Sequence, residues 1–160
     1  MRVSHGGIPP LFDGESRVLI LGTMPSPKSR EAAFYYAHPQ NRFWRVLAEI
    51  LGEGWPPAAE ERAALCHRRH IALWDVLASC EIEGAADSTI RDPEPNDIAG
   101  LLKRAPIRAV FTTGVTAAKL YQKLLPDLPR AIPLPSTSPA NCRVRFEELV
   151  EQYRVILEYL

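Results

Sequence analysis

The sequence lacks three features that would indicate a class of protein at once: a net charge, a CxxC cysteine pair and a long apolar run. Nineteen Lys and Arg residues balance nineteen Asp and Glu residues, so a polyanion would have to be bound by a local basic patch. Cys66, Cys80 and Cys142 are an odd number of cysteines without CxxC spacing, which argues against a disulfide framework and an iron–sulfur site. Because no apolar run approaches the roughly 20 residues that span a bilayer, we expect no association with membranes.

The N-terminus also lacks the apolar segment of a secretory signal. We therefore expect a cytoplasmic location and reduced thiols. The length of 160 residues fits one domain spanning residues 1–160, and the composition gives no reason to expect more than a monomer.

Apolar periodicity predicts an alternation of strands and helices. Four short apolar runs end in Gly, Pro or a polar residue, as buried parallel strands do: residues 17–22, 70–77, 107–114 and 130–135. Helical spacing of apolar residues follows in five segments: residues 41–51, 58–67, 97–104, 115–125 and 144–160. This order predicts an α/β fold, a three-layer α/β/α sandwich with a central, mainly parallel four-stranded sheet. In such sheets ligands bind beyond the carboxyl ends of the strands.

Three loops at that edge carry small, hydroxyl or proline residues, which let backbone N–H groups approach an anion: residues 22–41, 75–88 and 135–143. Ordinary connections between elements are the plain alternative. The first loop is the richest in basic residues. Between positions 25 and 45 there is only one acid, Glu31, but there are four basic residues: Lys28, Arg30, Arg42 and Arg45. Such a patch suits phosphate contacts.

Aromatic and polar residues crowd into residues 33–47 of the same loop and helix. Tyr35 and Tyr36 could stack on a base, or they could simply cover the core. Asn41 is a plausible N-cap of the following helix, and that structural role alone would account for it.

Three motifs, "LGTMPS", "YYAHPQNRFW" and "LPSTSPAN", together resemble the uracil-DNA glycosylase superfamily, and within it the hypoxanthine-DNA glycosylase branch. The resemblance runs from about Pro9 to the last helix. In most of the superfamily an Asp or Asn stands where this chain has Met24 and positions the attacking water. The hypoxanthine branch shares the departure and uses the asparagine of its HPxN block, which here is Asn41. We expect Asn41 to orient the water through its carbonyl oxygen.

The resemblance implies a uracil-DNA glycosylase-like fold and a monofunctional enzyme that hydrolyses the N-glycosidic bond of a deaminated base in DNA. Hypoxanthine is the expected base, with xanthine or uracil as side substrates, and neither a metal nor another cofactor is implied. Base-binding residues would be Thr23, Met24, Pro25, Tyr36, His38 and Asp75. DNA-binding residues would be Ser26, Lys28, Ser29, Arg42, Ser136, Thr137, Ser138, Asn141 and Arg143.

Several alternatives stay open. His38 could be a general acid or could hold its loop through a hydrogen bond. Asp75 could read a base edge, orient another group or cap a turn. Ser138 or Asn141 could cap the last helix, and Cys66, His67, His70 and Cys80 could form a zinc site. A non-catalytic nucleic-acid-binding protein of the same fold is the alternative function.

Overall fold

The computed structural model describes residues 1–5, 7–84 and 86–160. Its central sheet has four parallel strands in the order β3-β2-β6-β7. The strands are β2 (Val18–Gly22), β3 (Ile71–Asp75), β6 (Ala109–Thr113) and β7 (Ala131–Leu134). Each lies within a segment that the sequence predicts as a strand, so the predicted sheet is confirmed.

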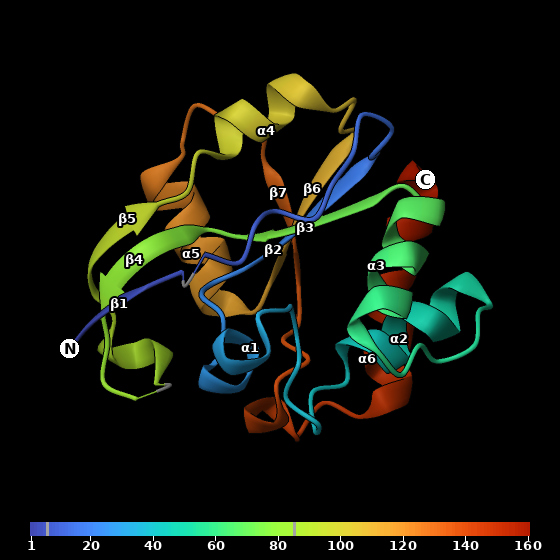
Figure 1. Cartoon of the computed structure of the whole chain (residues 1–160), viewed down its shortest axis with the longest axis horizontal. Helices are drawn as coiled ribbons and strands as arrows, with labels where there is room; N and C mark the ends of the chain where they lie inside the picture. The colour runs from blue at the N-terminus through green and yellow to red at the C-terminus, as the bar shows by residue number, and fades with distance from the viewer. Residues whose placement is uncertain (6, 85) are drawn as a thin grey trace.

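Helices cover both faces of this sheet (Figure 1). One apolar cluster joins it to α2 (Phe43–Leu51), α3 (Ala59–Arg68) and α6 (Phe146–Tyr153). The other cluster joins it to α4 (Ile98–Arg104) and α5 (Val115–Leu124). The predicted three-layer sandwich is therefore confirmed, although the last helix, predicted over residues 144–160, divides into α6 and the 3-10 helix η3 (Arg154–Tyr159).

Strand β2 shows why the apolar runs predict buried parallel strands. All five of its residues are buried. Val18 and Ile20 belong to one apolar cluster, whereas Leu19 and Leu21 belong to the other. Because side chains alternate across a strand, a sheet with helices on both faces needs apolar residues at every position.

A second sheet was not predicted. It is antiparallel, with strand order β1-β4-β5, and consists of β1 (Arg2–Ser4), β4 (Leu77–Glu81) and β5 (Arg91–Pro95). The expectation that residues 75–88 form a loop is thus wrong for β4, because a single residue, Val76, separates the end of β3 from the start of β4. Ala85 lies outside the described residues. Pairing of β1 with β4 brings the N-terminal segment beside the end of β3, where the backbone N–H of His5 donates to the Ala78 carbonyl at 2.7 Å.

The short helix α1 (Pro27–Ala32) also lies in a segment predicted as a loop. Ser26 is its N-cap and accepts a hydrogen bond from the backbone N–H of Ser29, and Pro27 occupies the first position of the helix. A serine followed by a proline is a known signal for a helix start. The sequence therefore contained this signal.

The possible zinc site is ruled out by the positions of its cysteines. Cys66 lies in the cluster with α2 and α6, whereas Cys80 lies in the cluster with α4 and α5 on the other side of the sheet. Within residues 1–5, 7–84 and 86–160, no three His, Cys, Asp or Glu residues are grouped so that they could hold a metal ion.

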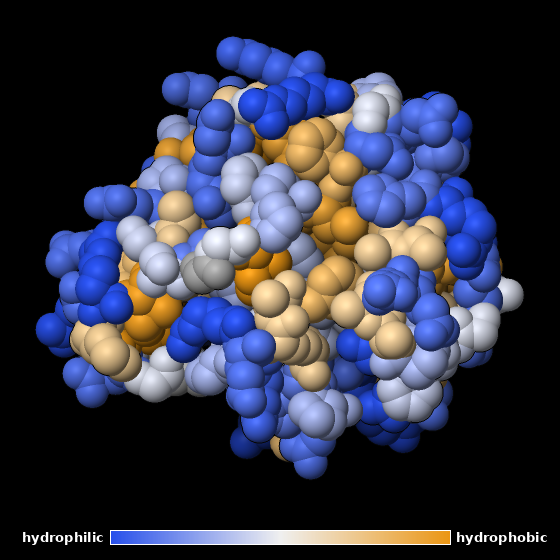
Figure 2. Space-filling model, viewed as in Figure 1, coloured by the Kyte–Doolittle hydropathy of each residue, from blue (hydrophilic) through white to orange (hydrophobic). Residues whose placement is uncertain are grey.

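Hydrophilic side chains cover most of the face seen in Figure 2, and apolar side chains show mainly in its middle. None of the helices in the described part of the chain has the length and apolar character needed to cross a membrane.

Candidate active site

A cavity of about 510 Å³ opens at the carboxyl ends of the parallel strands. Its walls are the segments that follow β2, β3, β6 and β7, which is the edge where a parallel sheet binds its ligands. Its volume lies within the roughly 300–1,000 Å³ typical of ligand pockets. In Figure 1, α1 and the loop after β7 lie below the sheet at this edge.

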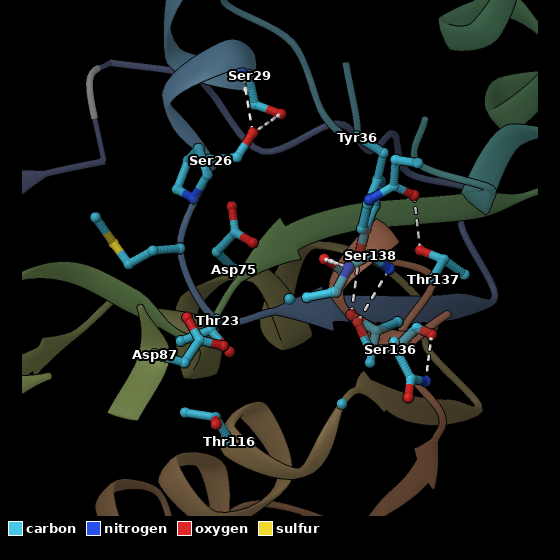
Figure 3. A pocket seen from close by; sticks show the side chains of 18 of the residues that line it. Thr23, Ser26, Ser29, Tyr36, Asp75, Asp87, Thr116, Ser136, Thr137 and Ser138 are labelled. Atoms are coloured by element: carbon cyan, nitrogen blue, oxygen red, sulfur yellow. Dashed lines mark hydrogen bonds between the residues drawn. The ribbon is translucent and has the colours of Figure 1, made fainter. Parts of the chain in front are cut away.

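Most residues that the sequence singles out line this cavity. They are Thr23, Met24, Pro25, Ser26, Ser29, Tyr36, Asn41, Asp75, Ser136, Thr137, Ser138 and Asn141. The cavity thus brings together all three predicted loops, the second of them through Asp75, Ile82, Gly84, Ala86 and Asp87 (Figure 3).

Asn41 is held by two hydrogen bonds to its side-chain oxygen. The backbone N–H of Phe43 donates to Oδ1 at 2.9 Å, and the hydroxyl of Thr137 donates to the same atom at 2.8 Å. Because a backbone N–H can only donate, the atom facing it must be the amide oxygen, and the NH₂ group is left for the cavity. The N-cap of α2 is Arg42, so the prediction of Asn41 as the N-cap is wrong by one residue. The Asn41 carbonyl oxygen already accepts these two bonds, and its expected role toward a water stays a prediction.

The loop after β7 is tied to the segment before α2. The backbone N–H of Arg42 donates to the Thr137 carbonyl at 3.1 Å, and the guanidinium of Arg42 donates to the carbonyls of Val144 at 2.6 Å and Asn141 at 3.1 Å. Arg42 and the hydroxyl of Thr137 therefore join two loops, and their part in DNA binding stays a prediction. Together they fix the position of Asn41.

Tyr36 offers one ring face to the cavity. Its other face stacks on Phe43, with the ring centroids 3.9 Å apart and the planes 12° from parallel. Its hydroxyl lies 3.3 Å from Oγ1 of Thr113, and burial raises its pKa above the usual value. Tyr35, by contrast, is buried and donates to the Pro9 carbonyl at 2.8 Å. Both tyrosines therefore pack against the core and line the cavity, and stacking of a base on Tyr36 stays a prediction.

Asp75 lies opposite Gly22 in the parallel register and reaches the cavity from the end of β3. His5 Nε2 lies 2.8 Å from Asp75 Oδ2, and both side chains are buried. A Cβ atom on Gly22 would lie only 2.6 Å from Asp75 Oδ1. Burial raises the pKa of the Asp75 carboxyl, and the hydrogen bond from His5 opposes this shift. Figure 3 shows the carboxylate in the middle of the cavity.

The serine hydroxyls of both loops serve the loops themselves. Ser29 Oγ accepts from the backbone N–H of Ala37 at 3.1 Å and from the Ser26 hydroxyl at 3.2 Å. Ser136 Oγ accepts from the backbone N–H of Ser138 at 3.1 Å. Ser138 caps the 3-10 helix η2 (Pro139–Asn141) and not the last helix, so that alternative is wrong. These bonds shape the walls of the cavity.

Four predicted residues do not line the cavity: Arg42, described above, and His38, Lys28 and Arg143. His38 accepts a hydrogen bond from the backbone N–H of Gln40 at 3.1 Å, which supports its role in holding the loop. Lys28 is exposed and lies 4.0 Å from Glu31, and Arg143 is exposed on the loop after β7. Their place in DNA binding stays a prediction.

The sequence analysis missed two parts of the site. The turn after β6 supplies Thr113, Gly114, Val115 and Thr116 to the cavity. This turn follows β6 at the same edge of the sheet as the ends of the other three parallel strands, and that position is the signal that predicts its place in the site. His5 had no such signal, since it reaches Asp75 only through the unpredicted sheet.

Comparisons with known proteins agree with this geometry. Residues 9–159 match the model of the uracil DNA glycosylase superfamily. A protein named hypoxanthine DNA glycosylase from Methanosarcina acetivorans is 38% identical over 86% of this chain and 88% of its own length. A protein of the same name from Methanosarcina barkeri is 39% identical over 74% of this chain and 76% of its own length.

A solved structure is similar over almost the whole chain. It is a solution NMR structure from Methanosarcina acetivorans, described as a candidate uracil DNA glycosylase. It is 34% identical, has a TM-score of 0.79, and the similarity covers 98% of this chain and 99% of that one.

Replacing Gly22 with alanine should destabilise the protein. The new methyl group would meet Asp75 Oδ1, and the hydrogen bond from His5 keeps the carboxylate from moving away. We expect a loss of about 1–3 kcal/mol in the free energy of unfolding, measured by urea denaturation. Gly54→Ala is the matched control, because a Cβ there meets nothing within 4 Å. Equal stability of both variants would contradict the close approach.

Replacing Asp75 with asparagine should stabilise the protein at neutral pH. A carboxyl with a raised pKa binds its proton more tightly in the folded state, so its contribution to stability falls as pH rises through that pKa. Asparagine does not ionise and can still accept from His5. We expect a higher melting temperature than wild type at pH 7, with the difference vanishing below the usual aspartate pKa of about 3.9. A variant that melts lower than wild type at pH 7 would contradict this assignment.

Proposed function

The chain belongs to the uracil DNA glycosylase superfamily, and we propose that it is a monofunctional DNA glycosylase that releases hypoxanthine from deoxyinosine. The observation that carries the proposal is the cavity at the sheet edge, which combines an amide, a carboxylate and an aromatic ring in a chain closely similar to two hypoxanthine DNA glycosylases. Xanthine and uracil are possible further substrates in this proposal. A monomeric state, a single domain and a cytoplasmic location remain predictions.

A base must leave the duplex before it can enter such a cavity. Extruding a nucleotide costs a few kcal/mol, and least when the base is already mispaired. We propose that the base stacks on the free face of Tyr36, because the other face lies on Phe43. Base–aromatic stacking contributes roughly 1–3 kcal/mol, which offsets much of that cost.

Around the cavity, the phosphates on either side of the flipped nucleotide need donors. The loop after β7 offers the backbone N–H groups of Ser136 and Thr137, whereas those of Ser138, Ala140 and Asn141 are bonded within the loop. Lys28, on α1, and Arg143, on the loop after β7, are exposed. We propose these groups as the phosphate contacts. Arg30, which lines the cavity and donates to the Pro25 carbonyl at 3.3 Å, adds positive charge at the mouth.

Cleavage of the N-glycosidic bond builds positive charge on the sugar and negative charge on the leaving base. Donors held in place before the reaction stabilise such charge best. The NH₂ group of Asn41 is such a donor, because its amide plane is fixed by Phe43 and Thr137. This NH₂ group can donate a hydrogen bond to the oxygen of the attacking water, or it can donate one to the departing base. Water adds its hydroxyl to C1′, and its proton ends on the base.

Strand nicking is not part of the proposal. Nicking glycosylases use an amine that forms a Schiff base with the sugar. None of the described residues that line the cavity is a lysine. We therefore propose that the product is an intact abasic strand.

Replacing Asn41 with alanine should abolish most activity. The variant loses the donor aimed at the cavity, for which we expect a loss of about 10²–10³ in the single-turnover excision rate. The assay uses end-labelled duplexes with one deoxyinosine, xanthosine or deoxyuridine, followed by alkali. Gln40→Ala, at the exposed neighbouring position, is the matched control and should excise like wild type. Wild-type rates in Asn41→Ala would exclude the role of Asn41, and no excision of any base by wild type would favour the binding-protein alternative.

Replacing Thr137 with valine tests how Asn41 is held. Valine keeps the shape of threonine but cannot donate to Asn41 Oδ1. One of the two bonds that fix the amide is then lost, so we expect about a tenfold lower excision rate with little change in DNA affinity. Thr137→Ser, which keeps the hydroxyl, should restore most of the rate. If valine instead weakened DNA binding without changing excision, Thr137 would be a phosphate contact after all.

A further inference from the structure

His5 has no part in the chemistry described so far, and its partner Asp75 has entered only as the carboxylate of the cavity. His5 is 7% exposed and Asp75 is 4% exposed, so each is almost fully enclosed. They are 70 residues apart in the sequence, and pairing of β1 with β4 brings them together. An almost enclosed charged or polar pair next to a ligand cavity is unusual, because burial disfavours the charged form.

The geometry settles how the pair is bonded when the carboxyl is ionised. A carboxylate can only accept, so the ring N–H at Nε2 of His5 donates to Oδ2 of Asp75 at 2.8 Å. The tautomer of His5 and the rotation of the carboxylate are thereby linked.

The second oxygen, Oδ1, lies at the floor of the cavity. It has no hydrogen-bond partner in the described part of the chain, and it is not among the polar atoms sealed from solvent there. A point above Gly22 lies 2.6 Å from Oδ1, 3.4 Å from the Tyr36 hydroxyl and 3.7 Å from Thr113 Oγ1. Of these three polar atoms, Oδ1 alone carries charge when Asp75 is ionised.

We propose that His5 is a positioning residue: it holds the Asp75 carboxylate ionised and oriented, so that Oδ1 accepts the lactam N–H of a deaminated base. This inference rests on the proposed glycosylase function and adds the feature of the base that is recognised. His5 itself does not touch the base.

Deamination supplies the chemistry that such an acceptor recognises. It converts adenine to hypoxanthine and changes the ring nitrogen N1 from an acceptor into an N–H donor. An ionised carboxylate attracts this donor and repels the lone pair that unmodified adenine presents at the same place. The pair therefore selects bases that carry a lactam N–H and disfavours adenine.

The groups around the pair set the direction of its pH dependence. Those that face it or share the cavity are Tyr35, Tyr36, Arg30 and Asp87. Burial raises the pKa values of both tyrosines, so they stay neutral, and burial also raises the pKa of Asp87. The bond from His5 is what opposes the raised pKa of Asp75, so its removal shifts that pKa further upward. As the pH falls, Asp75 should then become protonated at a higher pH than in wild type, and excision should be lost at that higher pH.

Two substitutions at His5 separate this role from simple packing. His5→Phe keeps a ring and loses the donor, and His5→Gln keeps an N–H at nearly the same distance from the backbone. Single-turnover excision of deoxyinosine is measured from pH 4.5 to 9 for wild type and both variants, and melting curves show that each is folded. We expect the acidic limb of the rate profile to move up by about one pH unit or more in His5→Phe, and His5→Gln to restore it.

Asp75→Asn tests the acceptor directly. His5 needs an acceptor, so the amide oxygen should take the place of Oδ2 and the NH₂ group the place of Oδ1. A donor would then face the donor of hypoxanthine, and we expect excision to fall by about a hundredfold or more at every pH, without an acidic limb.

The outcomes are distinct. Three results together support the inference. The acidic limb of the rate profile shifts upward in His5→Phe and returns in His5→Gln, and excision in Asp75→Asn is low at every pH, without an acidic limb. Active wild type with the same profile in His5→Phe, or a loss that is equal at every pH, would overturn it and leave the proposed function intact. No excision by wild type overturns both. The ¹³C signal of the Asp75 carboxyl, followed through a pH titration of wild type and His5→Phe, gives a readout that does not depend on excision and should show the same upward shift.

Discussion

Strand β2 ends in a residue without a side chain, and the arrangement of the cavity depends on that. Gly22 lies opposite Asp75 in the register of two buried parallel strands. Any Cβ at this position would meet Asp75 Oδ1 at 2.6 Å, and it would lie in ordinary contact with the hydroxyls of Tyr36 and Thr113. The missing side chain lets groups from three different segments converge on one floor. A carboxylate, a phenol and a threonine hydroxyl can then face the same ligand.

The walls of the cavity are held by a different means. The loops after β2 and β7 carry many hydroxyl groups, yet most of these are bonded within the loops or between them, as in the bond from Thr137 to Asn41. Arg42 adds two bonds to carbonyls about 100 residues away in the sequence. Groups that the sequence offers as ligands for phosphate therefore act first on each other. The result is an amide whose direction is set before DNA arrives, which is the condition for effective electrostatic stabilisation.

This division explains which parts of the molecule could be predicted. The four parallel strands are buried on both faces, so their apolar runs were plain, and the site followed from the rule that places ligands at their carboxyl ends. β1 has three residues and β5, "RDPEP", has two prolines and exposed side chains, so neither carries an apolar alternation. What holds them is pairing with β4, a long-range contact that no local pattern records. His5 was missed for the same reason.

Side-chain roles were harder to predict than positions for a similar reason. Asn41 and Thr137 were both expected at the site, and both line the cavity, but their hydrogen bonds to each other determine which atom of each remains available. An amide offers a donor and an acceptor, and only its neighbours decide which of the two meets a ligand. The same holds for Asp75, whose two oxygens are made different by His5. The chemistry of this cavity therefore depends on pairs of residues. Each pair joins segments that are distant in the chain, so only the fold determines which atoms face the ligand.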